Sequence, residues 1–332
     1  MKLAIVILNW NGKTLLETFL PSVVEHSSGH DIYVVDNAST DTSVQFLESK
    51  YPSVNCVKLS QNLGYAAGYN ESLKQINADI YCLLNSDIEV TKNWLEPIID
   101  IFQTQANTHI VQPKILDYNK KNYFEYAGAG GGFIDQLGYP YCRGRIFNSI
   151  EADKGQYDDR TEIFWASGAC LFIRASTFKS LEGFDSKFFA HMEEIDLCWR
   201  AKNKGYQIEY TGASSVYHVG GATLHDSSPK KTYLNFRNSL FTLVKNTHHP
   251  LIGIVYLRLS LDGLAGLRFL FQGKFKHTVA IIKAHLSFYR ELPYLVRMRQ
   301  KNKKIAAPNS LLPSIVWSFF ILNIKRYNNL DK

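Results

Sequence analysis

Over the first hundred residues, short apolar runs alternate with longer segments in which apolar residues recur at helical spacing. The apolar runs are mostly rich in β-branched residues, which is typical of strands buried on both faces. Strands are therefore predicted at residues 3–8, 32–35, 54–59 and 80–84, and helices at residues 14–25, 42–50 and 66–76.

This alternation predicts an α/β fold with a mostly parallel sheet, whose ligands bind at the carboxyl ends of the strands. From residue 110 to residue 207 the pattern is less regular. A strand is predicted there at residues 169–173, and a helix at residues 192–204 that ends at Gly205. The glycine-rich run at residues 127–132 lacks the Gly-Lys-Ser/Thr of a P-loop and is interpreted as a flexible loop.

The net charge of +7 conceals a division between two parts of the chain. Residues 230–332 contain 18 Lys and Arg against 3 Asp and Glu, whereas residues 1–229 contain 19 against 27. We therefore expect a main α/β domain at residues 1–229, followed by a basic helical tail at residues 230–332.

Apolar and basic residues mix at helical spacing in this tail, and its apolar stretches are shorter than the roughly 20 residues that span a bilayer. Arg258, Asp262 and Arg268 interrupt its most hydrophobic part. The pattern favours an amphipathic segment on an anionic membrane surface. A helical cap that packs on the main domain, with its basic face in solvent, is the alternative.

The cysteines and the first residues of the chain bear on the cellular compartment. The five cysteines are odd in number and widely spaced, which argues for buried thiols rather than a disulfide framework or a zinc site. The first residues form a strand pattern without the features of a secretory signal. We therefore expect a cytoplasmic protein.

Two predicted strands end in a carboxylate. Asp36 follows the run at residues 32–35, and Asp87 follows the run at residues 80–84 in the segment Asn85-Ser86-Asp87. At the ligand edge of the sheet, Asp36 can accept hydrogen bonds from a ribose or a base. Two carboxylates in one crevice invite Mg²⁺ or Mn²⁺, which prefer oxygen ligands and substrate phosphates. Each segment alone is also an ordinary turn sequence.

A third group of acidic residues opens the predicted helix at residues 192–204. Glu193, Asp196 and Arg200 share a polar stripe with charge pairs at i,i+3 and i,i+4. Glu194 lies off this stripe on a mainly small or apolar side, where desolvation would raise its pKa toward that of a useful base. A first-turn glutamate that merely favours the helix dipole is the alternative.

His218 follows a β-like run near the end of the main domain. A lone histidine in that position is more often structural than a ligand. Because the chain also offers Asp87 as a possible metal ligand, His218 becomes a candidate for a second one.

In this order, these segments resemble the large family 2 of inverting glycosyltransferases, which have the GT-A fold. The resemblance covers residues 3 to about 224 and is closest to bacterial rhamnosyltransferase-like members that build surface polysaccharides. The matching segments are Val6–Asn11, Val34–Asp41, Asn62–Asn70, Leu84–Asp87, Phe184-Asp185, the helix Glu193–Arg200, and His218.

The resemblance implies a role for each segment. Residues 1–110 would form the nucleotide-sugar half and residues 111–229 the acceptor half. Asn85-Ser86-Asp87 matches the DxD-type motif with Asn85 at its first acidic position, so the metal would be held by Asp87, His218 and the diphosphate. Glu194 matches the catalytic base, which is commonly Asp, and Asp196 would support the helix start or the acceptor. The nucleotide-sugar contacts would be Leu8, Asn9, Trp10, Asp36, Asn62, Gly64, Asn85, Ser86 and Asp87, and the acceptor contacts Trp165, Gly168, Ala169 and Glu193.

The implied activity is metal-dependent transfer of a sugar, with inversion, from dTDP-rhamnose or a UDP-sugar. The acceptor would be a hydroxyl of a glycan or a lipid-linked acceptor, at the inner face of the cytoplasmic membrane. No nucleic-acid partner is expected, although the basic, aromatic tail keeps a nucleic-acid-binding protein as an alternative. A non-catalytic nucleotide-sugar-binding module is a second alternative. A nicotinamide-dependent oxidoreductase is disfavoured because Asn9-Trp10-Asn11-Gly12 follows the first strand in place of Gly-x-Gly-x-x-Gly.

Overall fold

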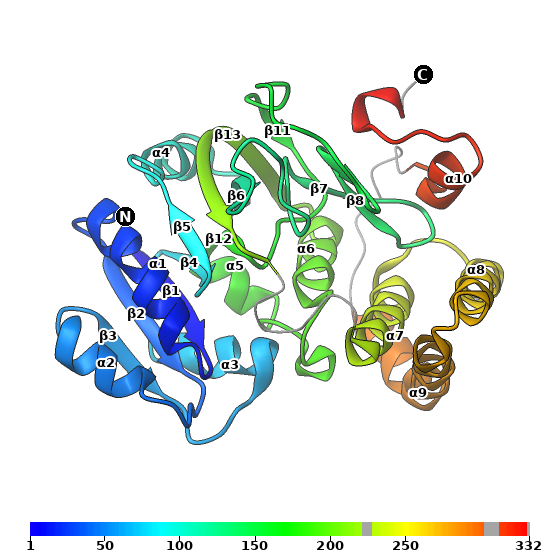
Figure 1. Cartoon of the computed structure of the whole chain (residues 1–332), viewed down its shortest axis with the longest axis horizontal. Helices are drawn as coiled ribbons and strands as arrows, with labels where there is room; N and C mark the ends of the chain where they lie inside the picture. The colour runs from blue at the N-terminus through cyan, green and yellow to red at the C-terminus, as the bar shows by residue number, and fades with distance from the viewer. Residues whose placement is uncertain (221–227, 302–311, 331–332) are drawn as a thin grey trace.

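The computed structural model describes residues 1–220, 228–301 and 312–330 (Figure 1). Its centre is a large mixed sheet with helices on both faces, and a small sheet and further helices lie on the side away from α1 and α2. The strands are β1 (Leu3–Asn9), β2 (Asp31–Asp36), β3 (Asn55–Lys58), β4 (Ile80–Asn85), β5 (Ile88–Val90), β6 (Thr108–Asp117), β7 (Gly132–Ile134), β8 (Pro140–Cys142), β9 (Arg145–Ile146), β10 (Ser149–Ile150), β11 (Arg160–Glu162), β12 (Cys170–Arg174) and β13 (Gln207–His218). The α-helices are α1 (Lys13–His26), α2 (Ser43–Lys50), α3 (Gly64–Leu73), α4 (Glu96–Thr104), α5 (Ala175–Ser180), α6 (Glu193–Asn203), α7 (Pro229–Asn246), α8 (Leu251–Phe271), α9 (Phe275–Lys301) and α10 (Ile315–Phe320).

The α/β fold class is confirmed, and every predicted strand and helix of the main domain is present with ends that differ by three residues or fewer. Strands β3, β2, β1 and β4 pair in parallel, and β12 then runs antiparallel between β4 and β6. The sequence of residues 54–59 suggested a buried strand, and this prediction is wrong. The strand there, β3, is at the edge of the sheet and exposes Asn55 and Lys58.

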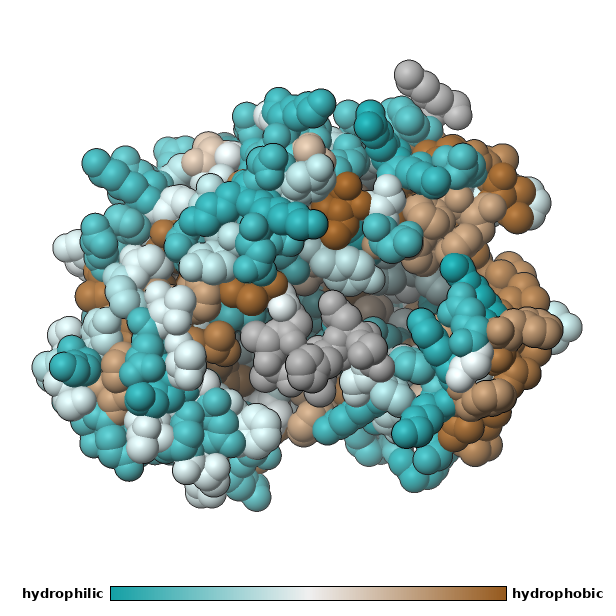
Figure 2. Space-filling view, in the orientation of Figure 1, coloured by the Kyte–Doolittle hydropathy of each residue, from teal (hydrophilic) through white to brown (hydrophobic). Residues whose placement is uncertain are grey.

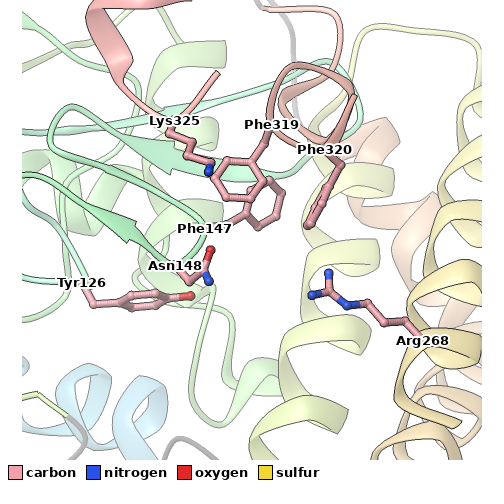
Figure 3. A pocket seen from close by; sticks show the side chains of 7 residues that line it. All are labelled: Tyr126, Phe147, Asn148, Arg268, Phe319, Phe320 and Lys325. Carbon is pink, nitrogen blue, oxygen red and sulfur yellow. The ribbon is translucent and has the colours of Figure 1, made fainter. Parts of the chain in front are cut away.

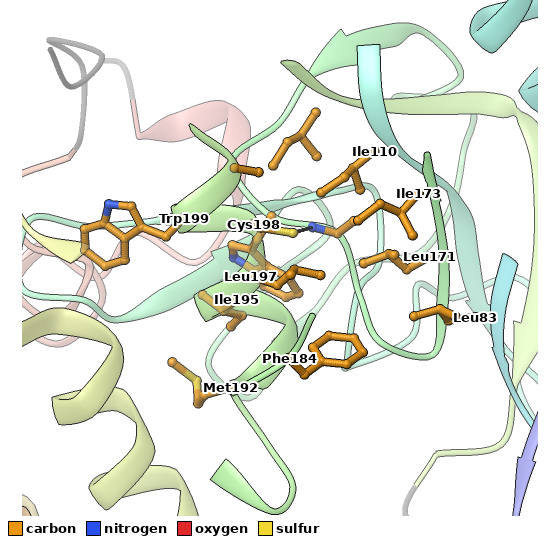
Figure 4. Packing of buried hydrophobic residues seen from close by; sticks show 14 of the residues in the cluster. Leu83, Ile110, Leu171, Ile173, Phe184, Met192, Ile195, Leu197, Cys198 and Trp199 are labelled. Atoms are coloured by element: carbon orange, nitrogen blue, oxygen red, sulfur yellow. Dashed lines mark hydrogen bonds between the residues drawn. The ribbon is translucent and has the colours of Figure 1, made fainter. Parts of the chain in front are cut away.

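Side chains of the central strands alternate between two hydrophobic cores. Leu3, Ile5 and Ile7 of β1 pack with residues of α1, α2 and α4 on one face of the sheet. Ala4 and Val6 pack with α3, α5 and α6 on the other face. Figure 4 shows Leu197 and Cys198 of α6 against the strand residues of this second core, where the Cys198 thiol accepts a hydrogen bond from Ala166 N at 3.4 Å.

The glycine-rich run is a packed part of this core and not the flexible loop that its composition suggested. A β-carbon on Gly132 would lie 2.1 Å from the Trp165 ring, and one on Gly128 would lie 2.5 Å from Ser167 Cβ. Glycine is required at both positions because no side chain fits between these neighbouring segments.

Part of the basic tail completes the second core. Leu240 and Phe241 of α7, together with Phe288 and Leu295 of α9, are at most 1% exposed and belong to the same hydrophobic cluster as the sheet. Residue 229, where we placed the end of the main domain, is the first residue of α7. It marks a change in charge and the start of a helix, while the hydrophobic core continues across it.

A buried charge network joins α6 to α7. Lys245 of α7 is fully buried, and its Nζ donates to Asp185 Oδ2 at 2.6 Å and to Asp196 Oδ2 at 2.9 Å. Arg200 Nε also donates to Asp196 at 2.8 Å, and Tyr294 of α9 donates to Asp185 at 2.9 Å. Burial alone would raise the pKa of Asp196, but the positive charges and hydrogen bonds of Lys245 and Arg200 outweigh burial and lower the pKa. The stripe of Asp196 and Arg200 predicted on α6 therefore faces α7 and not solvent.

Helix α8 directs two of its three charged residues inward. Arg258 and Asp262 are at most 3% exposed, and Arg258 donates to Asp262 Oδ1 at 2.9 Å and to Ser239 Oγ of α7 at 2.7 Å. The Arg258 guanidinium also lies 3.7 Å from the centre of the Tyr139 ring. These contacts turn the apolar side of α8 outward, and in the described part of the chain no helix is long and apolar enough to cross a membrane.

We predict that Lys245→Met lowers the free energy of unfolding by about 3–5 kcal/mol, because it leaves Asp185 without a countercharge and weakens the pairing of Asp196. Equilibrium urea unfolding measures this change. Lys283→Met is the control, since Lys283 is exposed on α9 and surface substitutions change stability by about 0.5 kcal/mol or less. Equal stability of the two variants would show that the network contributes nothing.

Candidate active site

The ends of β1 and β2 present two buried acceptor atoms. Strand register pairs Asn9 with Asp36, and both side chains are at most 4% exposed. Asp36 Oδ2 accepts a hydrogen bond from Ser39 N at 3.1 Å, and Asn9 Nδ2 donates to Ser39 Oγ at 3.3 Å. Among the described residues, nothing donates to Asn9 Oδ1 or Asp36 Oδ1. Buried acceptors without a partner are uncommon and suit the hydroxyl and amine groups of a nucleoside.

The segment before α3 closes the same edge of the sheet. Asn37 Nδ2 donates to Asn62 Oδ1 and to Gly64 O, each at 3.1 Å. Gly64 has φ +73°, and a β-carbon there would lie 2.8 Å from the Phe189 ring. Glycine is therefore needed for both the backbone angle and the close contact.

Two further predicted nucleoside contacts flank this edge at different depths. Leu8 is partly buried and packs against Gly68 of α3. Trp10 is 48% exposed just beyond β1, so its ring is available at the rim of the site.

Asn85, Ser86 and Asp87 lie at the end of β4 and in the turn to β5. Asp87 is 5% exposed, and its backbone carbonyl accepts a hydrogen bond from Val219 N at 3.2 Å. Asp36 and Asp87 belong to strand ends that are not neighbours in the sheet, because β1 lies between β2 and β4. Two strand spacings amount to roughly 10 Å, which is too far for both carboxylates to hold one ion.

His218 meets Asp87 at the end of β13. Its Nε2 lies 3.2 Å from Asp87 Oδ1, and its Nδ1 lies 3.3 Å from Glu125 Oε1. Burial alone would lower the pKa of His218, but Glu125 and Asp87 outweigh it and raise the pKa to about 10. The two carboxylates thus favour a positive charge between them.

This arrangement fits a divalent cation in its donor chemistry. A carboxylate on one ring nitrogen fixes a histidine so that the other nitrogen can bind a metal, and Glu125 stands in that relation to His218. Asn85 Nδ2 lies 3.4 Å from His218 Nε2 and offers no charge. Within residues 1–220, 228–301 and 312–330, no three His, Cys, Asp or Glu side chains converge as a metal site. A cation held by Asp87 and His218 would therefore need donors from a ligand such as a diphosphate.

The backbone before α6 is strained. Phe189, His191 and Met192 all have positive φ angles, of 64°, 68° and 70°. Asn238 of α7 holds this segment, because its Nδ2 lies 3.0 Å from Phe188 O, 2.9 Å from Ala190 O and 2.7 Å from His191 O. Strain of this kind persists only where surrounding contacts enforce it, and it is common at functional sites.

Glu194, the second residue of α6, has an unpaired carboxylate oxygen. Its Oε2 is buried and has no hydrogen-bond partner among the described residues. Burial raises its pKa to about 7, although backbone hydrogen bonds lower it. Burial also raises the pKa of the neighbouring Glu193, and the charge of Glu194 adds to that effect. A carboxylate in this environment can take a proton near neutral pH.

Residues 168–169 connect the two sides of the site. The backbone carbonyl of Ala169 accepts a hydrogen bond from Asn85 N at 2.9 Å. Gly168 lies beside α6, since a β-carbon there would be 3.7 Å from Glu194 Cβ, and its carbonyl accepts from Tyr65 Oη at 2.7 Å. The end of β4 and the start of α6 are thus neighbours in space.

Two predicted site residues lie beneath the surface. Trp165 is 2% exposed, and its indole donates to Phe133 O at 2.7 Å, so it supports the wall and does not present its ring to an acceptor. Asp196 is fully buried in the network with Lys245. Of the two roles expected for Asp196, its position supports the helix start and leaves it no access to an acceptor.

Three residues of this region were not predicted from the sequence: Glu125, Tyr65 and Asn238. Glu125 lies in an irregular segment just before the glycine-rich run, where no periodic pattern draws attention to it. Tyr65 was inside a matching segment but had no separate signal. Asn238 lies in a helix whose basic charge dominated the interpretation.

Two curated proteins similar to this chain are named as sugar transferases. It is 24% identical over 290 residues to the low-salt glycan biosynthesis hexosyltransferase Agl10 of Haloferax volcanii, covering 84% of this chain and 88% of that protein. It is 25% identical to the N-acetylglucosaminyl-diphospho-decaprenol L-rhamnosyltransferase of Mycobacterium tuberculosis, covering 65% of this chain and 75% of that protein.

Solved structures share the fold. TarS 1-349 of S. aureus in complex with UDP-GlcNAc matches with a TM-score of 0.54 and 16% identity, covering 90% of this chain and 84% of that one. The mannosyltransferase PcManGT of Pyrobaculum calidifontis, in complex with GDP-Man and Mn²⁺, matches with a TM-score of 0.53 and 12% identity over the same shares.

The model of the family described as "Glycosyl transferase family 2" matches residues 4–180, which is more than half of the sequence. These residues include the ends of β1, β2 and β4 and the contact between Asn85 and Ala169. The chain therefore belongs to glycosyl transferase family 2.

Proposed function

We propose that this chain transfers a sugar from a nucleotide-diphosphate sugar, dTDP-rhamnose or a UDP-sugar, to a hydroxyl of a glycan or lipid-linked acceptor with inversion. The observation that carries the proposal is Glu194, a partly buried side chain whose carboxylate has one buried, unpaired oxygen and a pKa of about 7. Through Gly168 and Ala169 it neighbours the strand end that leads to Asp87. Agl10 and the mycobacterial rhamnosyltransferase support a role in surface polysaccharide synthesis.

The reaction is a direct displacement. Glu194 takes the proton of the acceptor hydroxyl, whose oxygen attacks the anomeric carbon. The bond from that carbon to the diphosphate oxygen breaks, and the nucleoside diphosphate leaves from the opposite side with both bonding electrons. Asn9 and Asp36 accept hydrogen bonds from the nucleoside, while Asn62 and Gly64 shape the loop beside it. Gly168, Ala169 and Glu193 line the acceptor side.

Asp87 and His218 are the proposed ligands of Mg²⁺ or Mn²⁺. The metal-bound neighbour PcManGT supports a divalent cation in this fold. When bound, the ion supplies positive charge that stabilises the leaving diphosphate. The chain's own contribution is to hold Asp87 through Val219 and His218 through Glu125.

The cytoplasmic membrane surface is the proposed location of the enzyme. Figure 2 shows apolar side chains gathered along the edge formed by α8, α9 and α10. Exposed basic residues on and beside these helices, including Lys274, Lys276, Lys283 and Arg290, complement an anionic bilayer. Burying each exposed Leu or Phe in lipid gains about 1.5–3 kcal/mol. We call these side chains the apolar face; it consists of Ile252, Tyr256, Leu264, Leu267, Phe271, Val279, Ile282, Leu286, Tyr289, Trp317, Phe320, Ile321 and Leu322, each at least 47% exposed.

We predict that Glu194→Gln lowers kcat by about 10²–10⁴-fold, the usual contribution of a general base. Donor affinity is expected to stay unchanged, because the substitution removes only the proton acceptor. Steady-state kinetics and donor titration measure the two effects. Glu71→Gln, an exposed change on α3, is the control, and turnover equal to that control would remove Glu194 from the mechanism.

We predict that Asp87→Asn abolishes the metal-dependent part of donor binding. In a thermal-shift titration with UDP-sugars and dTDP-rhamnose, wild-type protein is expected to gain stability only with Mn²⁺ or Mg²⁺ present. Glu89→Gln is the matched control, two residues away in β5. An Asp87→Asn protein that keeps the full metal-dependent shift would contradict the assignment.

We predict that Leu264→Glu with Leu267→Glu releases the protein from vesicles of phosphatidylcholine and phosphatidylglycerol in a flotation assay. The two carboxylates would enter the lipid and also repel its negative charge. Ser260→Glu with Gln272→Glu adds the same charge at exposed polar positions of the same segment and is expected to weaken binding less. Equal flotation of both double variants would argue against docking through α8.

A further inference from the structure

A surface cavity of about 450 Å³ lies between the small sheet, α8 and α10 (Figure 3). Three phenylalanines form its aromatic centre, with the Phe147 ring 5.0 Å from Phe319 and 5.2 Å from Phe320. Seven described residues line it, and they include two bases and no carboxylate: Tyr126, Phe147, Asn148, Arg268, Phe319, Phe320 and Lys325. We call it the aromatic–basic cavity.

The two cations approach the aromatic centre from different elements. Figure 3 shows Lys325 and Arg268 on opposite sides of the rings, with the Arg268 guanidinium directed toward them. Arg268 belongs to α8 and lies 5.5 Å from the centre of the Phe320 ring. Two basic side chains in the lining of one cavity, with no carboxylate among its lining residues, favour an anion with several oxygens.

One lining residue of the aromatic–basic cavity is adjacent in sequence to a residue of the candidate active site. Tyr126 directly follows Glu125, whose carboxylate contacts His218 at 3.3 Å. Arg145 fixes Tyr126, because its Nε donates to Tyr126 O at 3.0 Å and its guanidinium lies 4.6 Å from the ring centre. Two consecutive residues, Glu125 and Tyr126, thus connect the proposed cation site to the cavity, and Arg145 fixes the position of Tyr126.

The opposite side borders the apolar face. Leu264, Arg268 and Phe271 follow one another at i, i+4 and i+7 on α8, so Arg268 lies within the apolar stripe. Phe320 belongs both to the cavity and to the apolar face. A ligand with an anionic head and a hydrocarbon chain would therefore find both parts of its chemistry side by side.

We infer that the aromatic–basic cavity binds the diphosphate of an isoprenoid-lipid-linked acceptor, with the lipid chain along the apolar face. This assignment rests on the proposed function, since it names the acceptor class of the same active site. Arg268 and Lys325 pair with the diphosphate oxygens, and the acceptor sugar extends past Tyr126 toward Glu194. The enzyme thereby takes its acceptor directly from the bilayer surface.

Flotation of the full chain with three kinds of phosphatidylcholine vesicle tests this site. One kind carries a polyprenyl diphosphate, and a second carries an uncharged polyprenol. The third carries phosphatidylglycerol in the amount that gives the same surface charge as the diphosphate. Wild-type protein is expected to prefer the polyprenyl diphosphate. Arg268→Ala with Lys325→Ala is expected to weaken that binding about thirtyfold, from the loss of two basic contacts at an anionic surface.

Lys276→Ala with Lys283→Ala is the matched control, because both lysines are exposed on α9 and lie outside the cavity. It is expected to weaken binding to phosphatidylglycerol while keeping the preference for the diphosphate. The site is overturned if wild-type protein shows no preference over phosphatidylglycerol, or if the cavity and control variants lose equal affinity for the diphosphate.

Metal-dependent hydrolysis of the sugar donor, without acceptor, separates this site from the proposed function. The cavity variant is expected to hydrolyse donor at the wild-type rate, since Arg268 and Lys325 are neither proposed donor contacts nor proposed catalytic residues. If wild-type protein neither hydrolyses nor binds a donor, the proposed function fails. Selective diphosphate binding in that case would still support the cavity as a lipid diphosphate site.

Discussion

The buried network of Asp185, Lys245, Asp196 and Arg200 is the interaction on which the arrangement of this site depends. It fixes the first turns of α6 against α7 through Lys245 and Asp196, which are fully buried, and Arg200, which is 7% exposed. Asn238, two turns earlier on α7, holds the strained segment that leads into α6. Glu194 is thereby kept beside Gly168 with one oxygen free. A helix that charge composition assigned to the tail is thus part of the framework that positions the proposed catalytic base.

The same tail combines inward-facing charge with outward-facing apolar residues. Arg258 and Asp262 anchor α8 to α7 and to the Leu137–Tyr139 turn, and Asp262 also contacts His285 of α9. Replacing a buried ion pair by apolar residues is often neutral or stabilising. We therefore infer that the pair of Arg258 and Asp262 serves to orient α8, because it determines which side of the helix faces outward. The exposed apolar residues then form one surface next to the aromatic–basic cavity, instead of being scattered singly.

The fold of the first hundred residues was predictable because buried parallel strands are continuous apolar runs and their helices have a clear period. Asp36, Asp87, Glu194 and His218 could be proposed as candidates from the sequence, since each stands out at the end of a strand or the start of a helix. The order of the strands was not, because nothing in the local pattern says that β1 enters between β2 and β4. Glu125 escaped notice because its partner His218 is 93 residues away in the sequence. For α8, composition indicates an amphipathic helix, but nothing in the sequence shows that the i,i+4 pair of Arg258 and Asp262 marks its inner side.

The pH dependence of kcat/KM for sugar transfer tests the central claim, that Glu194 is the base, most directly. This parameter reports the pKa values of the free enzyme, and burial raises the pKa of Glu194 to about 7. Because a base must be deprotonated to act, kcat/KM is predicted to rise with pH through about 7 and to level off above it. A profile that stays flat through neutral pH, with any acid decline only near the ordinary glutamate pKa of about 4.3, would contradict this account.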